Sequence, residues 1–343
     1  MPHIPLREIA QRAGVSRMTV SRVIRNAPHV SPEIRSRVES ALRKLDYSPN
    51  PLLGVLMQSL RSNRAGKPQA GIAYVADIAG AKGGLLRMHR RFRDGARLAA
   101  ERLGYRIEVH ECDGSVAALR LVQRVVTARG LLGVVFGPMS RIASPDLPIA
   151  FEQPHIVLGE QWPNSVSHRV ENDQVHAAKL LFAELRRRGY ARFGWLQPGA
   201  ANPEDDYLYR VVLSHVQLGQ RARDRVPVFG AQGFNEKSFR EWFRRHEPDV
   251  LICKQQDHIA PWLEAMRLRA PEDVGLCCPD LEPGFMHIAG VAQLYERVTG
   301  AAVELVDGMI RRNERGIPGT PTYTLIEGRW NEGRTLRPAP RAA

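Results

Sequence analysis

Long apolar runs, paired cysteines and lysine are all scarce in this chain of 343 residues. It has no run of about eighteen apolar residues, the length a helix needs to cross a bilayer. The four cysteines, Cys112, Cys253, Cys277 and Cys278, have neither CxxC spacing nor the spacing of a disulfide framework. We therefore expect four reduced, buried thiols. Because no basic-then-apolar leader opens the sequence, we expect the protein to be cytoplasmic.

Signatures of catalysis and of metal binding are also missing. The sequence has no phosphate-binding GxxxxGK[ST] loop and no GxSxG nucleophile elbow. The run from His110 to Asp113 falls on a predicted strand, where neighbouring side chains face opposite ways, so at most two of its side chains would reach one ion. We therefore predict no enzymatic activity, no cofactor and no bound metal.

Basic residues, by contrast, are abundant and unevenly placed. Arginine supplies 43 of the 49 basic residues, and the net charge is +13. Residues 1–67 hold twelve Lys or Arg against four Asp or Glu, so a fifth of the chain carries most of the excess. Such a concentration of positive charge is what a phosphate-binding module needs.

The segment Leu6 to Ile24 reads as two short helices joined by a turn. Apolar residues recur at i, i+3, i+4 and i+7 in the first helix, and Gly14 ends it. Ser16 stands where the N-cap of a second helix is needed, and the apolar residues that follow would pack that helix back on the first. This is the helix-turn-helix pattern, whose second helix enters the major groove of DNA. An ordinary helical hairpin inside a larger core is the alternative.

The stretches LREIAQRAGVSRMTVSRVI and VSPEIRSRVESALRKLDYSPN resemble the headpiece of the lac-repressor family of bacterial regulators. The second stretch predicts a third helix, with Ser31 as its cap and Pro32 in its first turn. The resemblance implies a DNA-binding headpiece over residues 1–49 and a hinge helix over residues 50–61, followed by a linker over residues 62–69. In the family the hinge helix pairs with its dimer mate over the minor groove and wedges a leucine between base steps. A packed linker helix is the alternative interpretation of residues 50–61.

The outward face of the second helix and the resemblance together predict the contacts with DNA. Arg17, Met18 and Arg22 would face base edges, where arginine can bind guanine through two hydrogen bonds. Other polar residues would bind phosphates and set the register. The predicted DNA-binding residues are Ser16, Arg17, Met18, Thr19, Ser21, Arg22, Asn26, His29, Asn50, Leu53 and Leu56.

Beyond residue 69, apolar runs of strand length alternate with helical patterns as far as TYTLIEGRW. This alternation predicts an α/β fold with two doubly wound parallel-sheet subdomains. The family's core is similar, with two lobes that resemble periplasmic sugar-binding proteins and three chain crossings between them. We place the core at residues 70–340 and the crossings near Val166, Gln293 and Gly319. The expected N-lobe is then 70–166 with 294–319, and the expected C-lobe is 167–293 with 320–340.

Ligands of such sheets bind beyond the carboxyl ends of the strands, where carboxylates and amides can hold sugar hydroxyls. Each candidate there is equally well explained as a helix cap or a loop residue, and Asp173 is interpreted as a helix N-cap only. An arginine that relatives carry after the sixth strand is not clearly present, since Arg210 is offset from its position. The candidate effector-binding residues are Asp77, Gln256, Asp257, Asp280, Gln293 and Tyr295.

Two functions from different classes fit these patterns. The first is a homodimeric, sequence-specific regulator that binds a pseudo-palindromic DNA operator and represses carbohydrate-related genes. A small molecule between the lobes, a sugar or sugar derivative, would set its operator affinity. The second is a cytoplasmic sugar-binding protein or a sugar-acting enzyme without specific DNA binding. The first is favoured, because a transport protein needs an export leader and an enzyme needs a catalytic group.

Overall fold

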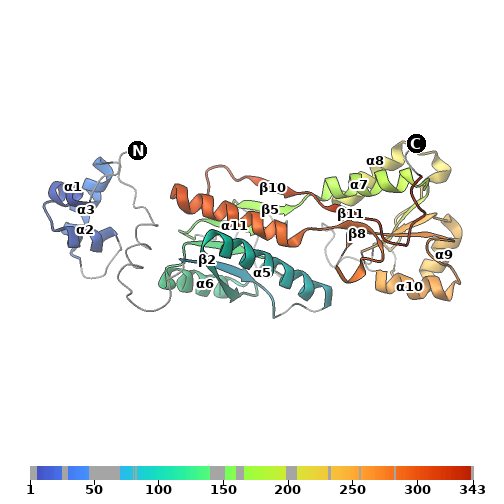
Figure 1. The fold of residues 1–343 in the computed structure, drawn as a ribbon, viewed down its shortest axis with the longest axis horizontal. Coiled ribbons are helices and arrows are strands. Elements are labelled where there is room, and N and C mark those ends of the chain that lie inside the picture. The colour runs from blue at the N-terminus through green and yellow to red at the C-terminus, as the bar shows by residue number, and fades with distance from the viewer. Residues whose placement is uncertain are drawn as a thin grey trace.

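The computed structural model describes residues 6–24, 30–45, 70–79, 81, 83–139, 151–159, 166–197, 207–230, 233–254, 256–281 and 283–340. A small helical unit is followed along the chain by two α/β lobes (Figure 1). The predicted hinge helix and linker, residues 50–61 and 62–69, lie outside the described residues.

Three short helices form the headpiece: α1 (Leu6–Ala13), α2 (Arg17–Ile24) and α3 (Pro32–Lys44). Their core is small, and Ile9, Val20 and Val38 at its centre are fully buried. The α3 N-terminus confirms the predicted cap, because the Ser31 hydroxyl accepts a hydrogen bond from the Ile34 N–H at 3.4 Å. A proline in the first turn costs nothing, since that N–H has no partner within the helix.

The N-lobe is built on a six-stranded, wholly parallel sheet in the order β10-β5-β4-β3-β1-β2. Two long helices, α5 (Gly83–Leu103) and α11 (Tyr295–Arg312), pack on one face, and α6 (Val116–Arg129) packs on the other (Figure 1). The helices α5 and α11 approach closely at Gly95, where a Cβ would lie 2.5 Å from the Glu296 carbonyl oxygen. The strands are β1 (Ala70–Ala76), β2 (Tyr105–Glu111), β3 (Gly133–Phe136), β4 (His155–Leu158), β5 (His168–Asn172) and β10 (Tyr323–Ile326).

The C-lobe has a five-stranded sheet in the order β11-β9-β8-β7-β6, in which only β11 is antiparallel to its neighbour. Its strands are β6 (Phe193–Trp195), β7 (Val250–Ile252), β8 (Gly275–Leu281), β9 (Ala289–Ala292) and β11 (Arg329–Asn331). One face is covered by α7 (Gln174–Arg187) and α8 (Tyr207–Leu218), the other by α9 (Glu236–His246) and α10 (Gln256–Ala265). Short 3-10 turns at Ala222–Asp224 and Pro283–Phe285 complete the lobe. The predicted α/β class with parallel sheets is confirmed.

The chain crosses between the lobes three times, and two crossings come later than expected. The first follows Asn172 rather than Val166, because β5 pairs with β4 in the N-lobe sheet. The second lies at Gln293, and the third follows Ile326 rather than Gly319, because β10 pairs with β5. Both displaced boundaries involve short strands, HRVEN with one apolar residue and YTLI with alternate residues exposed, so neither has the buried apolar run of the central strands. All three crossings leave a sheet at the carboxyl end of a strand, so the carboxyl ends of both sheets face the region between the lobes.

Asp173 and the four cysteines have the environments that the sequence predicts. Asp173 is the N-cap of α7, accepting a hydrogen bond from the His176 N–H at 2.7 Å. All four cysteines are buried thiols that form no disulfide. In the described part of the chain, no helix combines the length and the apolar character needed to cross a membrane.

A buried arginine fastens the last segment of the chain to the C-lobe. The Arg188 side chain is only 1% exposed and forms ion pairs with Glu184 of α7 and with Glu332, just beyond β11. Its guanidinium carbon also lies 5.0 Å from the centroid of the Trp330 ring. Arg188 therefore fixes β11, the strand that follows the third crossing, to α7.

Replacing Arg188 with Ala should destabilise the C-lobe by about 2 kcal/mol, because it removes the buried guanidinium that bonds both Glu184 and Glu332 and packs on Trp330, while Glu184 keeps only its pair with Arg187. Urea unfolding followed by tryptophan fluorescence measures the loss. The control is Arg312→Ala, which breaks an exposed pair with Glu314 and should change the free energy of unfolding by less than about 0.5 kcal/mol. Equal effects of the two substitutions would contradict the anchoring role of Arg188.

Candidate nucleic-acid interface and lobe junction

The turn between α1 and α2 is fixed by a glycine and an arginine. Gly14 has φ +62°, a left-handed conformation that glycine adopts without strain. From α3, Arg37 donates hydrogen bonds to the carbonyl oxygens of Ala13 at 2.7 Å and Gly14 at 3.3 Å. These bonds satisfy carbonyls at the end of α1 and set the direction in which α2 leaves the turn. Sequence reasoning missed Arg37, because its partners are backbone atoms more than twenty residues away.

The start of α2 is capped as predicted. The Thr19 N–H donates to the Ser16 hydroxyl at 3.1 Å, and the two hydroxyl oxygens lie 2.9 Å apart. The cap stabilises the first turn of the helix. It also places two hydroxyl groups at the exposed end of α2, where a helix N-terminus favours a phosphate.

The outer face of α2 carries the side chains that were predicted to read bases. Met18 is 63% exposed and Arg17 and Arg22 are exposed, while Val20 and Val23 face the headpiece core. Ser21 is half-buried beside them. The predicted contacts Asn26, His29, Asn50, Leu53 and Leu56 lie outside the described residues.

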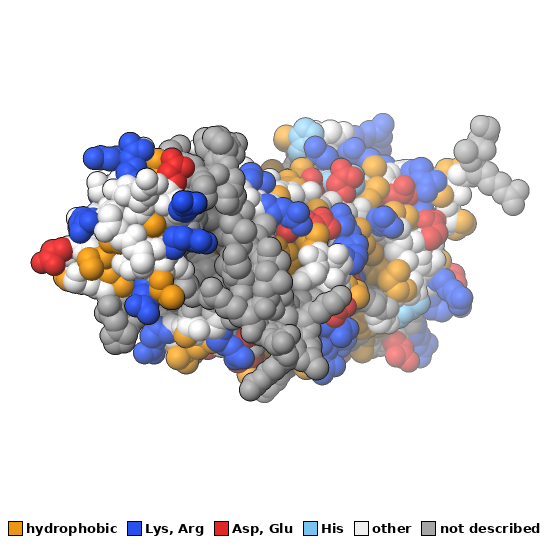
Figure 2. All heavy atoms as spheres, turned by 60° about the vertical axis from the view of Figure 1, so that its left-hand side comes forward, with side chains coloured by type: hydrophobic (Ala, Val, Ile, Leu, Met, Phe, Trp, Pro, Cys, Tyr) orange, Lys and Arg blue, Asp and Glu red, His pale blue; other side chains and the backbone are white. Residues whose placement is uncertain are grey.

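Positive charge surrounds this face. The described headpiece residues, 6–24 and 30–45, include eight Lys or Arg and three Asp or Glu. Figure 2 shows the basic side chains spread over the headpiece surface that faces the viewer. Such a surface attracts the phosphate backbone regardless of base sequence.

The second candidate region is the lobe junction, where Asp280, Gln293 and Tyr295 meet. The Tyr295 hydroxyl, at the start of α11 in the N-lobe, donates to Asp280 Oδ1 of β8 in the C-lobe at 2.6 Å. Gln293 Nε2 donates to the Pro279 carbonyl oxygen at 3.4 Å. Burial and the neighbouring Asp280 charge raise the pKa of Tyr295 well above its usual value, so this phenol stays protonated as the donor. The structure thus brings three of the six candidate effector residues together.

An aromatic pair forms the C-lobe side of the junction. Tyr209 of α8 stacks on Trp195 with ring centroids 5.3 Å apart, and its hydroxyl donates to the Pro279 carbonyl oxygen at 3.0 Å. Lys254 comes shortly after β7, and its ammonium nitrogen lies 5.4 Å from the Tyr209 ring centroid. Arg210, the residue offset from the family's arginine, follows Tyr209 on α8 and is exposed. The sequence does indicate that Tyr209 is buried, because the residue falls on the same apolar helical face as Leu213 and Val216.

Arg91 of α5 supports Tyr295 from the N-lobe side. Its guanidinium forms a two-pronged ion pair with Glu296 at 2.7 Å and lies 5.1 Å from the Tyr295 ring centroid. Phe92 packs edge-on against the same ring at 5.0 Å. The tyrosine that bonds the C-lobe is therefore held rigidly within the N-lobe.

The other candidates lie elsewhere around the junction. Asp77 follows β1 and is buried near His89 of α5. Burial lowers the pKa of His89, against the opposing charges of Asp77 and Glu111. Glu111 Oε1 accepts hydrogen bonds from two consecutive backbone N–H groups, those of residues 78 and 79, and so shapes the loop after β1. Gln256 and Asp257 are the first residues of α10, and their side chains lie outside the described part.

Several buried polar atoms near the carboxyl ends of the strands have no hydrogen-bond partner within the described protein. They include Trp195 Nε1, Gln293 Oε1 and Asn172 Oδ1, all on residues no more than 6% exposed. Buried polar groups in folded proteins are normally paired, with protein, water or ligand. Among the described residues, no group of three or more His, Cys, Asp or Glu is arranged to hold a metal ion.

Comparison with known proteins identifies the headpiece. Residues 5–50 match the model of the bacterial regulatory proteins of the lacI family. The lactose operon repressor of Escherichia coli (strain K12) is 38% identical over 92 residues, which are 24% of this chain and 26% of that protein. Residues 5–50 of this chain are therefore a headpiece of the lacI type. The matched segment covers only about a quarter of that relative's length.

Solved structures extend the likeness of this chain to the fold of the lobes. The lac repressor dimer bound to operator and the anti-inducer ONPF has a TM-score of 0.57 over 97% of this chain and 99% of that chain, at 17% identity. A LacI family transcriptional regulator from Arthrobacter sp. FB24 in complex with lactose has a TM-score of 0.58 over 78% and 99% of the two chains, at 19% identity. The two-lobed core therefore has the lacI-family fold.

Lowering the pH should destabilise the N-lobe through His89. Because its folded pKa lies below the unfolded value of about 6.5, the unfolded chain binds the proton first, and stability falls as the pH drops below that value. Between pH 6.5 and 5.5 the wild type should lose more stability than His89→Leu, which carries no proton at this position, by at most about 1.4 kcal/mol, the limit for one proton over one pH unit. Denaturant midpoints of both proteins at pH 7.5, 6.5 and 5.5 measure this, and parallel pH profiles would refute it.

Proposed function

We propose that this chain is a homodimeric, sequence-specific DNA-binding transcriptional regulator that represses carbohydrate-related genes. The observation that carries the proposal is the outer face of α2, where Arg17, Met18 and Arg22 are exposed on a basic headpiece of the lacI family. An exposed methionine between two arginines suits apolar contact with a thymine methyl group flanked by guanine contacts. Residues Asn50, Leu53 and Leu56 would extend the contacts into the minor groove.

The operator affinity would be set by a small polar effector at the lobe junction. The junction supplies a carboxylate, an amide, a tryptophan and two tyrosines, together with unpaired buried polar atoms. Aromatic faces and hydrogen-bonding groups of this kind suit a sugar or a sugar derivative. Structural neighbours solved in complex with lactose or with cellobiose support this ligand class. An effector acts on DNA affinity only if it binds the two lobe arrangements with different affinities.

We propose a regulator without enzymatic activity, because the polar groups of the described junction are explained by mutual hydrogen bonds and by ligand binding. No activated nucleophile with a matching base is needed to account for them. The alternative class, a sugar-binding protein without specific DNA binding, leaves the exposed face of α2 without a role.

The proposal is tested by selecting binding sites from a random DNA library with the purified full chain at about 150 mM salt, where nonspecific phosphate binding is weak. We expect a pseudo-palindrome, since two headpieces on a two-fold axis read two half-sites. A protein lacking residues 1–61 should enrich no sequence. Failure of the full chain to enrich any sequence, with and without a mixture of sugars, would overturn the proposal.

Arg22→Ala should relax the selected sequence at one position of each half-site and weaken binding to the wild-type site by about 1–3 kcal/mol. The control, Arg43→Ala, removes an exposed basic residue at the end of α3. It should leave the selected sequence unchanged. The two selected motifs are compared position by position, and an unchanged motif for Arg22→Ala would remove this residue from base recognition.

A further inference from the structure

The turn between α1 and α2 pairs its own donors locally but leaves two acceptors to a distant side chain. The N–H groups of Gly14 and Val15 donate to carbonyl oxygens of α1, at 3.3 Å and 3.0 Å. The carbonyl oxygens of Ala13 and Gly14 accept instead from Nη2 of Arg37 on α3, at 2.7 Å and 3.3 Å. Carbonyls at the end of a helix need partners outside that helix. Arg37 therefore closes the turn from the side of α3.

The contact between Arg37 and the turn is close. A Cβ on Gly14 would lie 2.6 Å from Nη2 of Arg37, so the guanidinium fills the space that a side chain would need. Val38, the next residue on α3, is fully buried in the headpiece core, and it holds the backbone from which Arg37 extends. The guanidinium therefore ties the turn to a fixed point of the core.

The direction in which α2 leaves the turn decides where its outer side chains lie. At a rise of about 1.5 Å per residue, Arg22 lies roughly 12 Å from Gly14, so a change of about 10° in helix direction moves it by roughly 2 Å. Hydrogen-bond distances vary by only about 0.5 Å. A displacement of roughly 2 Å would therefore break a hydrogen bond to a base edge, whereas attraction to the phosphate backbone tolerates it.

We propose that Arg37 is a positioning residue for base recognition, which sets the angle at which α2 enters the major groove. The inference rests on the proposed DNA-binding function and deepens it, because it assigns part of the sequence specificity to a residue outside the recognition helix. Direct contact with a phosphate is the other role open to an exposed arginine. A phosphate contact requires the positive charge at position 37, whereas the turn requires the reach and shape of a guanidinium.

Arg37→Lys separates these two roles in the full-length protein. Lysine keeps the charge, but its ammonium ends one bond short of the Nη2 position. We expect the affinity for the operator selected by the wild type to fall at least about tenfold, because base contacts are lost in both half-sites. The affinity for random DNA should change less than about twofold, which shows that the headpiece is folded and charged. Fluorescence anisotropy titrations between about 50 and 200 mM salt measure both affinities.

Gly14→Ala disturbs the same contact from the other side. The added Cβ displaces Nη2 of Arg37 and leaves the charge of the headpiece unchanged. It also occupies a left-handed backbone conformation, φ +62°, that disfavours alanine. We expect the same selective loss of operator affinity. Because both variants break one contact, the double variant should bind the operator little more weakly than the weaker of the two single variants.

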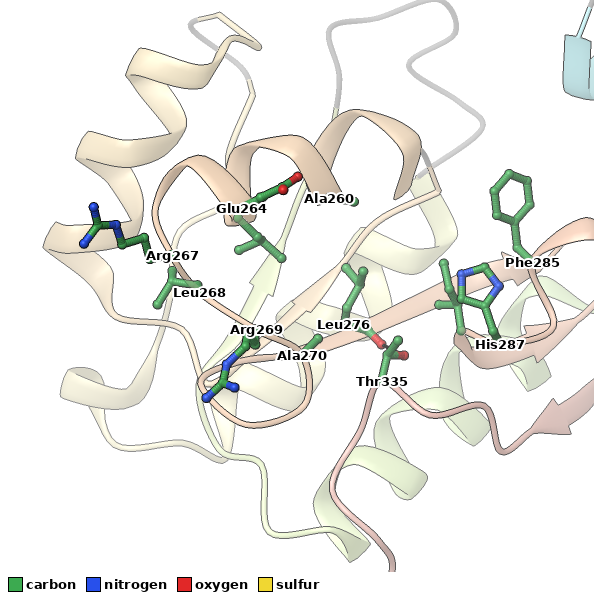
Figure 3. Close-up of a pocket in the computed structure, with 12 residues that line it drawn as sticks. Ala260, Glu264, Arg267, Leu268, Arg269, Ala270, Leu276, Phe285, His287 and Thr335 are labelled. Atoms are coloured by element: carbon green, nitrogen blue, oxygen red, sulfur yellow. Dashed lines mark hydrogen bonds between the residues drawn. The ribbon is translucent and has the colours of Figure 1, made fainter.

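Two other arginines control for the exchange of arginine by lysine. Arg43 is exposed in the last turn of α3 and represents the headpiece surface. Arg269 represents the C-lobe: its side chain is 76% exposed and extends away from the pocket beneath α10 (Figure 3). Arg43→Lys and Arg269→Lys should both bind operator and random DNA as the wild type does.

Wild-type operator affinity in Arg37→Lys would overturn this inference, and so would equal losses of affinity for operator and for random DNA. A wild type that selects no DNA sequence would refute the DNA-binding function and this inference with it. The two failures are distinguishable, because only in the first does the wild type have a selected operator.

Discussion

The three chain crossings are the constraint on which the rest of the molecule depends. Each leaves a parallel sheet at the carboxyl end of a strand, after Asn172, at Gln293 and after Ile326. Parallel strands end at one edge of their sheet, so both sheets must present that edge to the same junction. The loops and helix starts that follow strands are free of ladder hydrogen bonds. Polar side chains therefore gather at the junction, and the bond from Tyr295 to Asp280 is the direct tie across it.

Because Tyr295 bonds Asp280 across the junction, a ligand bound at this carboxylate would alter the contact between the lobes. A ligand that hydrogen-bonds Asp280 competes with Tyr295 for the same carboxylate and so changes how the lobes are held together. Tyr295 is fixed within the N-lobe by Arg91 and Phe92, which means that a change at its hydroxyl is passed to α5 and α11 as one rigid pair. The Arg87–Phe285 contact connects the same helix, α5, to the 3-10 turn Pro283–Phe285 of the C-lobe. The helix α5 thus contacts both the tyrosine of the junction and the C-lobe itself.

Local patterns in the sequence predicted the headpiece and the fold class well. Caps such as Ser16, Ser31 and Asp173 act over three residues, so the sequence alone indicates them. The apolar runs of the buried strands likewise stand out, because a parallel strand buried on both faces is apolar throughout. Asp280, Gln293 and Tyr295 were predicted as a set from their positions after strands, and the structure joins them, although as partners of one another.

Features that depend on distant pairing were not predictable in this way. The strands β5 and β10 lie next to each other at one end of the N-lobe sheet and are less buried than its central strands, so their ladder partners reveal them better than their sequences do. Arg37 acts on backbone carbonyls across the headpiece.

The most direct test of the account is the affinity of full-length Tyr295→Phe for the DNA site selected by the wild type. The control is Tyr323→Phe, which removes a hydroxyl bonded to Glu171 within the N-lobe. If the lobe junction sets operator affinity, loss of the Tyr295–Asp280 bond shifts the lobe equilibrium, and operator affinity changes by at least about fivefold, the lower end of typical allosteric coupling. The control should retain wild-type affinity. Equal operator affinity for wild type and Tyr295→Phe would contradict the claim that the junction controls the headpiece.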